Sequence, residues 1–113
     1  MEETMKKLSL IFIKLYMIVT FSTITLTAAE TLKVEGLCGM CKTRIEKAAK
    51  DVEGVTRAEW DRATKELTLE FDSGKTKVET ISKAIARVGH DNEKDKANDN
   101  VYNSLPGCCK YRK

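Results

Sequence analysis

The spacing of apolar residues between Thr31 and His90 alternates between two residues and a helical period, and this alternation limits the possible fold more than any other feature. Residues 31–34 place apolar side chains at every second position, as in a strand with one buried face. Apolar residues then recur at helical spacing: Ile45, Ala48, Ala49 and Val52. The sequence therefore predicts a strand at 31–34 and a helix at about 41–51 that Gly54 closes.

Two further strands and a second helix follow the first helix. Residues 55–61 carry apolar side chains at a spacing of two, and residues 65–71 do so more clearly. The short connection between them predicts an antiparallel hairpin. A second helix is predicted at 78–88, because its apolar residues form one stripe and Gly89 follows it. The stripe consists of Val78, Ile81, Ile85 and Val88.

This order of elements is that of a ferredoxin-like α+β sandwich, in which two helices cover one face of an antiparallel sheet. A last strand would complete the βαββαβ order. Residues 91–100 are highly polar, so any strand there must be short and poorly buried. With 113 residues the chain has room for little more than one small domain. We predict that domain over residues 30–97, followed by a tail over residues 98–113.

Cys38 and Cys41 form a C-x-x-C pair where the first predicted strand leads into the first helix. One cysteine lies in the loop and the other in the first helical turn, so both sulfurs can approach one ion while Gly39 lets the backbone bend. Amide groups at a helix N-terminus stabilise thiolates. Two thiolates suit a soft ion, whereas a structural zinc site needs two more ligands. The pair therefore predicts a soft-metal site.

The segment from Val34 to Glu46, V-E-G-L-C-G-M-C-K-T-R-I-E, resembles the heavy-metal-associated domain family. That family includes copper chaperones, periplasmic mercury-binding proteins and the N-terminal modules of metal-transporting ATPases. The resemblance covers about residues 31–90 and includes the turn Val52-Glu53-Gly54-Val55. It implies a ferredoxin-like fold, a metal ion held by the two cysteines, and a metal-transporting ATPase or another metal-binding domain as partner.

The loop departs from the family pattern in one respect. The family usually has G-M-x-C-x-x-C, whereas here only Leu37 separates Gly36 from Cys38. The loop is therefore one residue shorter and lacks the usual buried methionine, which bears on loop geometry and metal preference more than on the fold.

The sequence thus predicts an exported metallochaperone or metal scavenger. We expect Cu(I) as the ion, with Hg(II), Zn(II) and Cd(II) as alternatives. A thiol-disulfide redox protein is the alternative function, although Gly-Met between the cysteines lacks the proline of the usual redox motif. An inert structural pair is a third reading. The sequence has no Ser/His/Asp grouping, so we predict no enzyme activity.

Three residues outside the C-x-x-C pair are candidate auxiliary ligands. His90 follows the second predicted helix, in a loop that the ferredoxin-like arrangement places beside the C-x-x-C loop; a solvated or capping histidine is an equal alternative. Cys108 and Cys109 are adjacent, and a bond between them would close a strained ring. We favour auxiliary thiolates for them, with a disulfide to the C-x-x-C pair or no fixed role as alternatives. Met40 is expected to pack rather than to bind metal.

Residues 1–29 differ in composition from the rest of the chain. Two early lysines precede the largely apolar run Leu8–Leu26, and small residues follow it. This order predicts an export signal that is cleaved after Ala28 or Ala29. Lys14 interrupts the run, and the uncharged part that remains is shorter than the roughly 20 residues that a membrane-spanning helix needs. The alternative to cleavage is that the segment stays attached as an N-terminal membrane anchor. Both versions place the domain in the periplasm or on the outer face of the membrane.

The charge pattern gives little support to nucleic-acid binding. Lys and Arg number 20 against 17 acidic residues, and both signs are dispersed along the chain. The few aromatic residues are not interleaved with a basic patch, as a base-stacking surface would require. We therefore expect no nucleic-acid partner, and membrane contact only through an uncleaved N-terminal segment.

Overall fold

The computed structural model describes residues 26–113. The first 25 residues of the predicted export segment lie outside this part of the chain. The described elements are β1 (Thr27–Lys33), α2 (Gly39–Lys50), β2 (Val55–Trp60), β3 (Glu66–Asp72), α3 (Val78–Arg87), the short helix α4 (Asp99–Asn103) and the 3-10 turn η1 (Gly107–Cys109).

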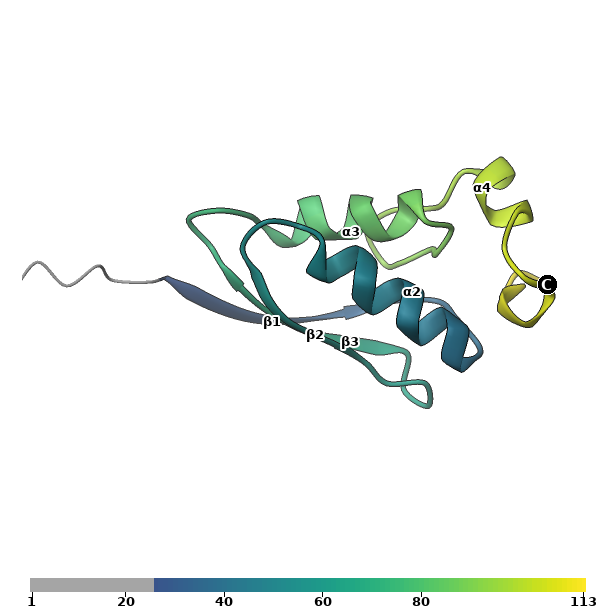
Figure 1. Ribbon diagram of the computed structural model, residues 1–113, viewed down its shortest axis with the longest axis horizontal. Coiled ribbons are helices and arrows are strands. Elements are labelled where there is room, and N and C mark those ends of the chain that lie inside the picture. The colour runs from purple at the N-terminus through teal and green to yellow at the C-terminus, as the bar shows by residue number, and fades with distance from the viewer. Residues whose placement is uncertain (1–25) are drawn as a thin grey trace, which may run out of the picture.

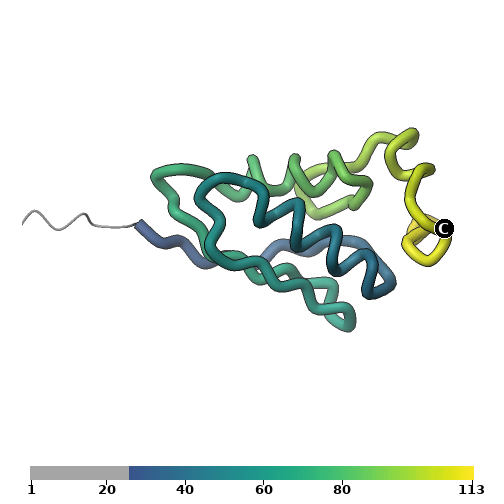
Figure 2. The backbone as a smooth tube through the Cα atoms, in the orientation of Figure 1, coloured from purple at the N-terminus to yellow at the C-terminus, as the bar shows by residue number. Residues whose placement is uncertain are grey.

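The three strands form an antiparallel sheet in the order β1-β3-β2. The central strand β3 alternates as predicted, with Leu67, Leu69 and Phe71 buried. Both long helices, α2 and α3, lie on one face of the sheet, as Figure 1 and Figure 2 show. The predicted ferredoxin-like α+β class is therefore confirmed.

A glycine follows each of the two long helices. α2 ends at Lys50, so Gly54 lies in the turn before β2 and does not itself end the helix as the sequence predicted, whereas α3 ends at Arg87 and Gly89 directly follows its C-cap residue. Gly54 and Gly89 have φ angles of +98° and +106°, in the left-handed region that side chains disfavour. Gly89 is also limited by space, because a Cβ atom there would lie 2.9 Å from Leu105 Cδ2. The end of α3 thus forms a close contact with the C-terminal tail.

The fourth strand of the βαββαβ order is reduced to one isolated bridge, between Val34 and Asn92. The side chain of Asn92 donates to the carbonyl oxygen of Ser82 and accepts from the backbone N–H groups of Lys94 and Asp95. These bonds hold the polar segment in turns instead of an extended strand.

Strand β1 begins at Thr27, four residues before the predicted start at Thr31. Its first residues pair with the end of β3, from Thr27 opposite Asp72 to Ala29 opposite Glu70. Cleavage of the export signal after Ala28 or Ala29 would remove the first two or three residues of this strand and leave the part up to Lys33 to pair with β3. The cleavage itself stays a prediction.

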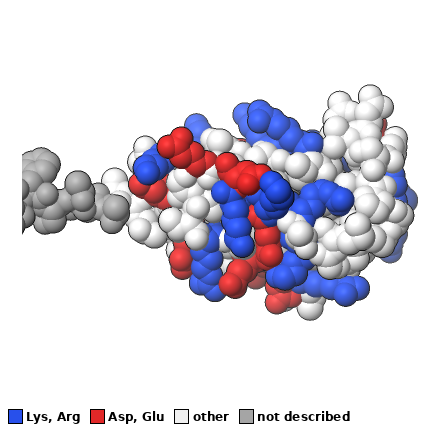
Figure 3. All heavy atoms as spheres, in the orientation of Figure 1, with Lys and Arg blue, Asp and Glu red and all other residues white. Residues whose placement is uncertain are grey.

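Charged side chains of both signs are intermixed over the face of the molecule that Figure 3 shows. Within α2, ion pairs join Lys42 to Glu46 and Lys47 to Asp51. Within residues 26–113, no helix has both the length and the apolar character needed to cross a membrane.

Candidate metal centre

The C-x-x-C pair lies where the sequence predicts, at the N-terminal end of α2. Cys38 is the N-cap residue with an extended backbone, and its carbonyl oxygen accepts the first helical hydrogen bond from Lys42 N at 3.1 Å. Cys41 lies in the first turn and is fully buried. The two Sγ atoms are 3.4 Å apart. One helix start therefore brings both sulfurs together, as a shared ion requires.

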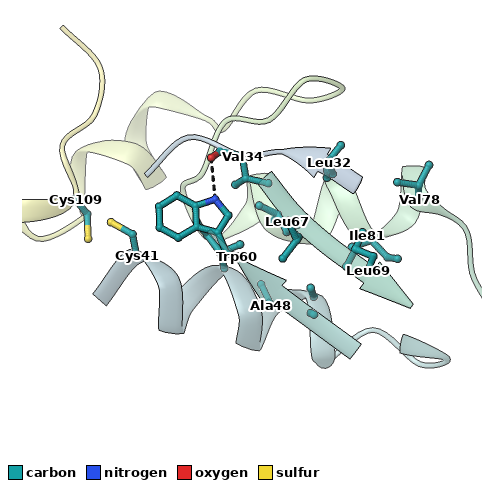
Figure 4. Packing of buried hydrophobic residues seen from close by; sticks show 14 of the residues in the cluster. Leu32, Val34, Cys41, Ala48, Trp60, Leu67, Leu69, Val78, Ile81 and Cys109 are labelled. Atoms are coloured by element: carbon teal, nitrogen blue, oxygen red, sulfur yellow. Dashed lines mark hydrogen bonds between the residues drawn. The ribbon is translucent and has the colours of Figure 1, made fainter. Parts of the chain in front are cut away.

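The side chain of Trp60 packs against the loop that leads from β1 to the C-x-x-C pair. Its ring is buried, and its indole N–H donates to the carbonyl oxygen of Val34 at 3.0 Å, as Figure 4 shows. Gly36 lies against the ring: a Cβ atom at Gly36 would be 3.0 Å from Trp60 and 3.1 Å from Cys41 Cβ. The sequence indicated Trp60 only as an inward strand residue, because its contact with the loop depends on tertiary packing.

The C-terminal tail brings two more thiols to the same place. The 3-10 turn η1 contacts α2, and Cys109 is fully buried, with its side chain facing Cys41 in Figure 4. Cys38 Sγ lies 3.0 Å from Cys108 Sγ and 3.3 Å from Cys109 Sγ, and the latter two sulfurs are 3.9 Å apart. All four cysteines are free thiols in the structure.

The surroundings shift the pKa values of three of the thiols, downward for Cys38 and upward for Cys108 and Cys109. A hydrogen bond from the Cys108 thiol, opposed by burial and aided by the backbone N–H of Cys41, lowers the pKa of Cys38 to about 6. The same bond to Cys38 raises the pKa of Cys108. Burial, together with the neighbouring thiols, raises the pKa of Cys109, although Arg44 Nη1 lies 3.5 Å from its sulfur. Cys38 is therefore largely a thiolate at neutral pH.

We expect iodoacetamide to alkylate Cys38 of the reduced protein with a half-maximal rate near pH 6. Because a thiolate is the reactive form, the rate should fall as the pH drops through the lowered pKa of Cys38 and should be constant well above it. The measurement is the pH dependence of alkylation at each cysteine by peptide mass mapping. In Cys108→Ser the hydrogen bond that most lowers the pKa of Cys38 is changed, so the pH at which Cys38 reacts at half its maximal rate should rise. A Cys38 midpoint near the ordinary value of about 8.5 in the native protein would contradict the assignment.

His90 is brought near the loop but not into the sulfur cluster. Its side chain is buried, and Nδ1 donates to the carbonyl oxygen of Glu35 at 2.8 Å. Burial lowers the pKa of His90, so the ring is neutral. Among the described residues, the candidate ligand atoms that all lie within 4.8 Å of one another come from Cys38, Cys108 and Cys109, a set that includes neither His90 nor Cys41. The structure thus places His90 as a residue that fixes the loop backbone.

Met40 was predicted to pack and not to bind metal, but it lies in the first turn of α2 with 54% of its surface exposed. Its Sδ atom lies 3.8 Å from Cys108 Sγ. Met40 therefore borders the outer side of the thiol cluster.

Comparison with known proteins decides the family. Residues 31–91 match the heavy-metal-associated domain, which is more than half of the chain. The chain belongs to the heavy-metal-associated domain family. The match ends before α4 and η1, so the tail with Cys108 and Cys109 lies outside it. Metal binding is the function of this family, and its match disfavours the redox alternative.

Two curated relatives and one solved structure illustrate the similarity. The chain is 36% identical over 63 residues to the copper chaperone CopZ of Staphylococcus aureus, covering 55% of this heavy-metal-associated protein and 93% of CopZ. It is 35% identical over 65 residues to the periplasmic component of a mercuric transport protein of Pseudomonas aeruginosa, covering 57% and 71%. The N-terminal domain of a potential copper-translocating P-type ATPase of Bacillus subtilis, solved in its Cu(I)-loaded state, has a TM-score of 0.56 and 28% identity, covering 59% and 85%.

Proposed function

We propose that the protein is an exported metallochaperone or metal scavenger that binds Cu(I) through Cys38 and Cys41. The observation that carries this proposal is the pair of sulfurs 3.4 Å apart at the N-terminal end of α2, one of them with a pKa lowered to about 6. A thiolate already present at neutral pH can capture a soft ion without first losing a proton.

The choice of Cu(I) rests on the all-sulfur donor set and on the copper proteins among the relatives. Because one relative is a component of a mercuric transport protein, Hg(II) is the second candidate for the bound ion. Zn(II) and Cd(II) are further alternatives. The proposed receiving partner is a metal-transporting ATPase or another metal-binding domain. We propose no catalytic activity, because the site is a cluster of thiols suited to binding an ion.

The experiment that tests this function compares metal binding with redox activity in the same reduced protein. Anaerobic titration with Cu(I) against a chromogenic chelator should show about one tightly bound ion per chain, as expected for one thiolate site. A parallel assay should show no catalytic reduction of a model disulfide. Repeated turnover of the disulfide together with weak Cu(I) binding would favour the redox protein instead.

Export is the part of the proposal that rests on the N-terminal segment. We expect mass spectrometry of the protein from its native host to find an N-terminus near Glu30, because small residues follow the apolar run there. Fractionation should place this form in the periplasm or outside the cell. An intact Met1 on membrane-bound protein would establish the anchor and contradict cleavage.

A further inference from the structure

The tail that carries Cys108 and Cys109 is docked on the domain by apolar packing. Tyr102 and Leu105 belong to the buried core, and Cys109 is fully buried beside them. Leu105 fits against Gly89, where a Cβ atom would lie 2.9 Å from its side chain. The tail is therefore packed against the end of α3, close to the N-terminal end of α2, as Figure 1 shows.

Hydrogen bonds fix the chain directly after the thiols. The guanidinium group of Arg112 makes a bidentate hydrogen bond with the carboxylate of Asp91: Nη2 donates to Oδ1 at 2.8 Å and Nε donates to Oδ2 at 3.0 Å. Tyr111 Oη donates to the carbonyl oxygen of Gly89 at 2.6 Å and accepts from Asp91 N at 2.6 Å. Planar arginine-carboxylate pairs are specific in direction. The position of the adjacent Cys109 is therefore set by contacts on both sides of it.

The sulfur separations match a site of three or four ligands better than one of two. Metal-sulfur bonds of about 2.3 Å separate the sulfurs by about 3.8 Å in a tetrahedral site, by about 4.0 Å in a trigonal site and by about 4.6 Å in a linear site. In the structure, Cys38 Sγ lies 3.0, 3.3 and 3.4 Å from the other three sulfurs, and the sulfurs of Cys108 and Cys109 are 3.9 Å apart. Small outward movements would seat an ion among Cys38, Cys108 and Cys109, whose sulfurs all lie within 4.8 Å of one another, whereas a linear pair needs a larger opening. Cys41, 3.4 Å from Cys38, is the fourth sulfur beside this group.

We propose that Cys108 and Cys109 are ligands of the same ion as Cys38 and Cys41, so that the docked tail closes an open two-thiolate site into one with three or four thiolates. This inference rests on the proposed function, because it takes Cys38 as the central ligand. The ion class is a soft ion that accepts three or four thiolates: Cu(I) with three, or a divalent d10 ion with four. Arg44, near Cys109, offsets part of the negative charge.

The closed site has one accessible side. Cys41 and Cys109 are fully buried and Cys38 is half-buried, whereas Cys108 is exposed. An incoming thiolate ligand therefore reaches the ion beside Cys108. In that exchange the new metal-sulfur bond forms as the bond to Cys108 breaks, the released sulfur takes up a proton from water, and the oxidation state of the metal does not change. The tail thus retains the ion until a competing ligand displaces Cys108.

The test compares Cu(I) affinity, sulfur coordination number and the rate of transfer to a competing dithiol in the reduced protein. Because Cys108 is exposed, Cys108→Ser should leave the fold intact. We expect it to weaken affinity roughly a hundredfold if each thiolate carries about a quarter of the binding free energy of a four-ligand site. Cys108→Ser/Cys109→Ser should leave two sulfurs around copper by X-ray absorption, against three or more in the native protein, and should speed transfer.

Matched variants separate the possible outcomes. Asn103→Ser alters an exposed tail residue away from the thiols and should change none of the readouts. Unchanged affinity and sulfur number in both tail variants, with binding lost in Cys38→Ser/Cys41→Ser, would overturn this inference and leave the proposed function intact. Undiminished binding in Cys38→Ser/Cys41→Ser would overturn both.

Discussion

Replacing both Cys38 and Cys41 by serine is expected to weaken Cu(I) binding by about four powers of ten. Structural zinc sites with four ligands bind with roughly 10–16 kcal/mol, or about 3 kcal/mol per ligand, and each 1.4 kcal/mol is a factor of ten. If each thiolate contributes the same share of the binding free energy, the loss of two thiolates weakens binding by about four powers of ten. Cys38 should account for more of it, because it contacts every other thiol of the cluster.

The affinity should be measured anaerobically by competition with a chromogenic Cu(I) chelator. Thr43→Ser is a matched control: it changes a residue of the same helical turn but keeps the hydroxyl that donates to the carbonyl oxygen of Gly39. The control should bind as the native protein does. A loss of less than tenfold in the double serine variant would mean that other groups hold the ion.

Replacing Trp60 by alanine should have the largest effect on the fold. The ring is 1% exposed and fills the space beneath the loop, so its removal leaves a cavity. Such replacements of large aromatic residues cost about 3–5 kcal/mol of the free energy of unfolding. Because small domains have a total of roughly 5–15 kcal/mol, this variant should be only marginally stable. Urea unfolding followed by circular dichroism measures the loss.

Trp60→Phe separates packing from hydrogen bonding. Phenylalanine keeps most of the ring but leaves the carbonyl oxygen of Val34 without the indole N–H, a loss of about 1–3 kcal/mol for a buried acceptor. We expect the phenylalanine variant to be less damaged than the alanine variant. If alanine cost less than 1 kcal/mol, the ring would not be the support of the loop that its contacts indicate.

The elements with a clear hydrophobic period could be predicted from the sequence. The alternation at 65–71 and the apolar stripe at 78–88 correspond to β3 and α3 within a residue or two, because burial of one face decides their structure locally. The start of β1 was harder to predict. Thr27–Ala29 resemble the end of an export signal in composition, and their pairing with β3 depends on a partner strand that is distant in sequence.

The candidate site was predictable only in part. The C-x-x-C pair is local, since only two residues separate its cysteines and one helix start positions both. The approach of Cys108 to Cys38 spans 70 positions and depends on how the tail docks. Docking follows from features that no sequence period shows, above all the fit of Leu105 against Gly89 and the bond of Arg112 to Asp91. The exposed position of Met40 was likewise decided by tertiary structure.

The measurement that most directly tests the central claim is a Cu(I) titration of the reduced, isotopically labelled protein followed residue by residue by NMR. The account predicts chemical-shift changes that saturate at about one ion per chain, as for one thiolate site, and that centre on residues 36–42 and the tail around Cys109. The outer residues of β1 and β2 should not respond. Changes that centre elsewhere, with the amides of Cys38 and Cys41 unaffected, would contradict metal binding at the start of α2.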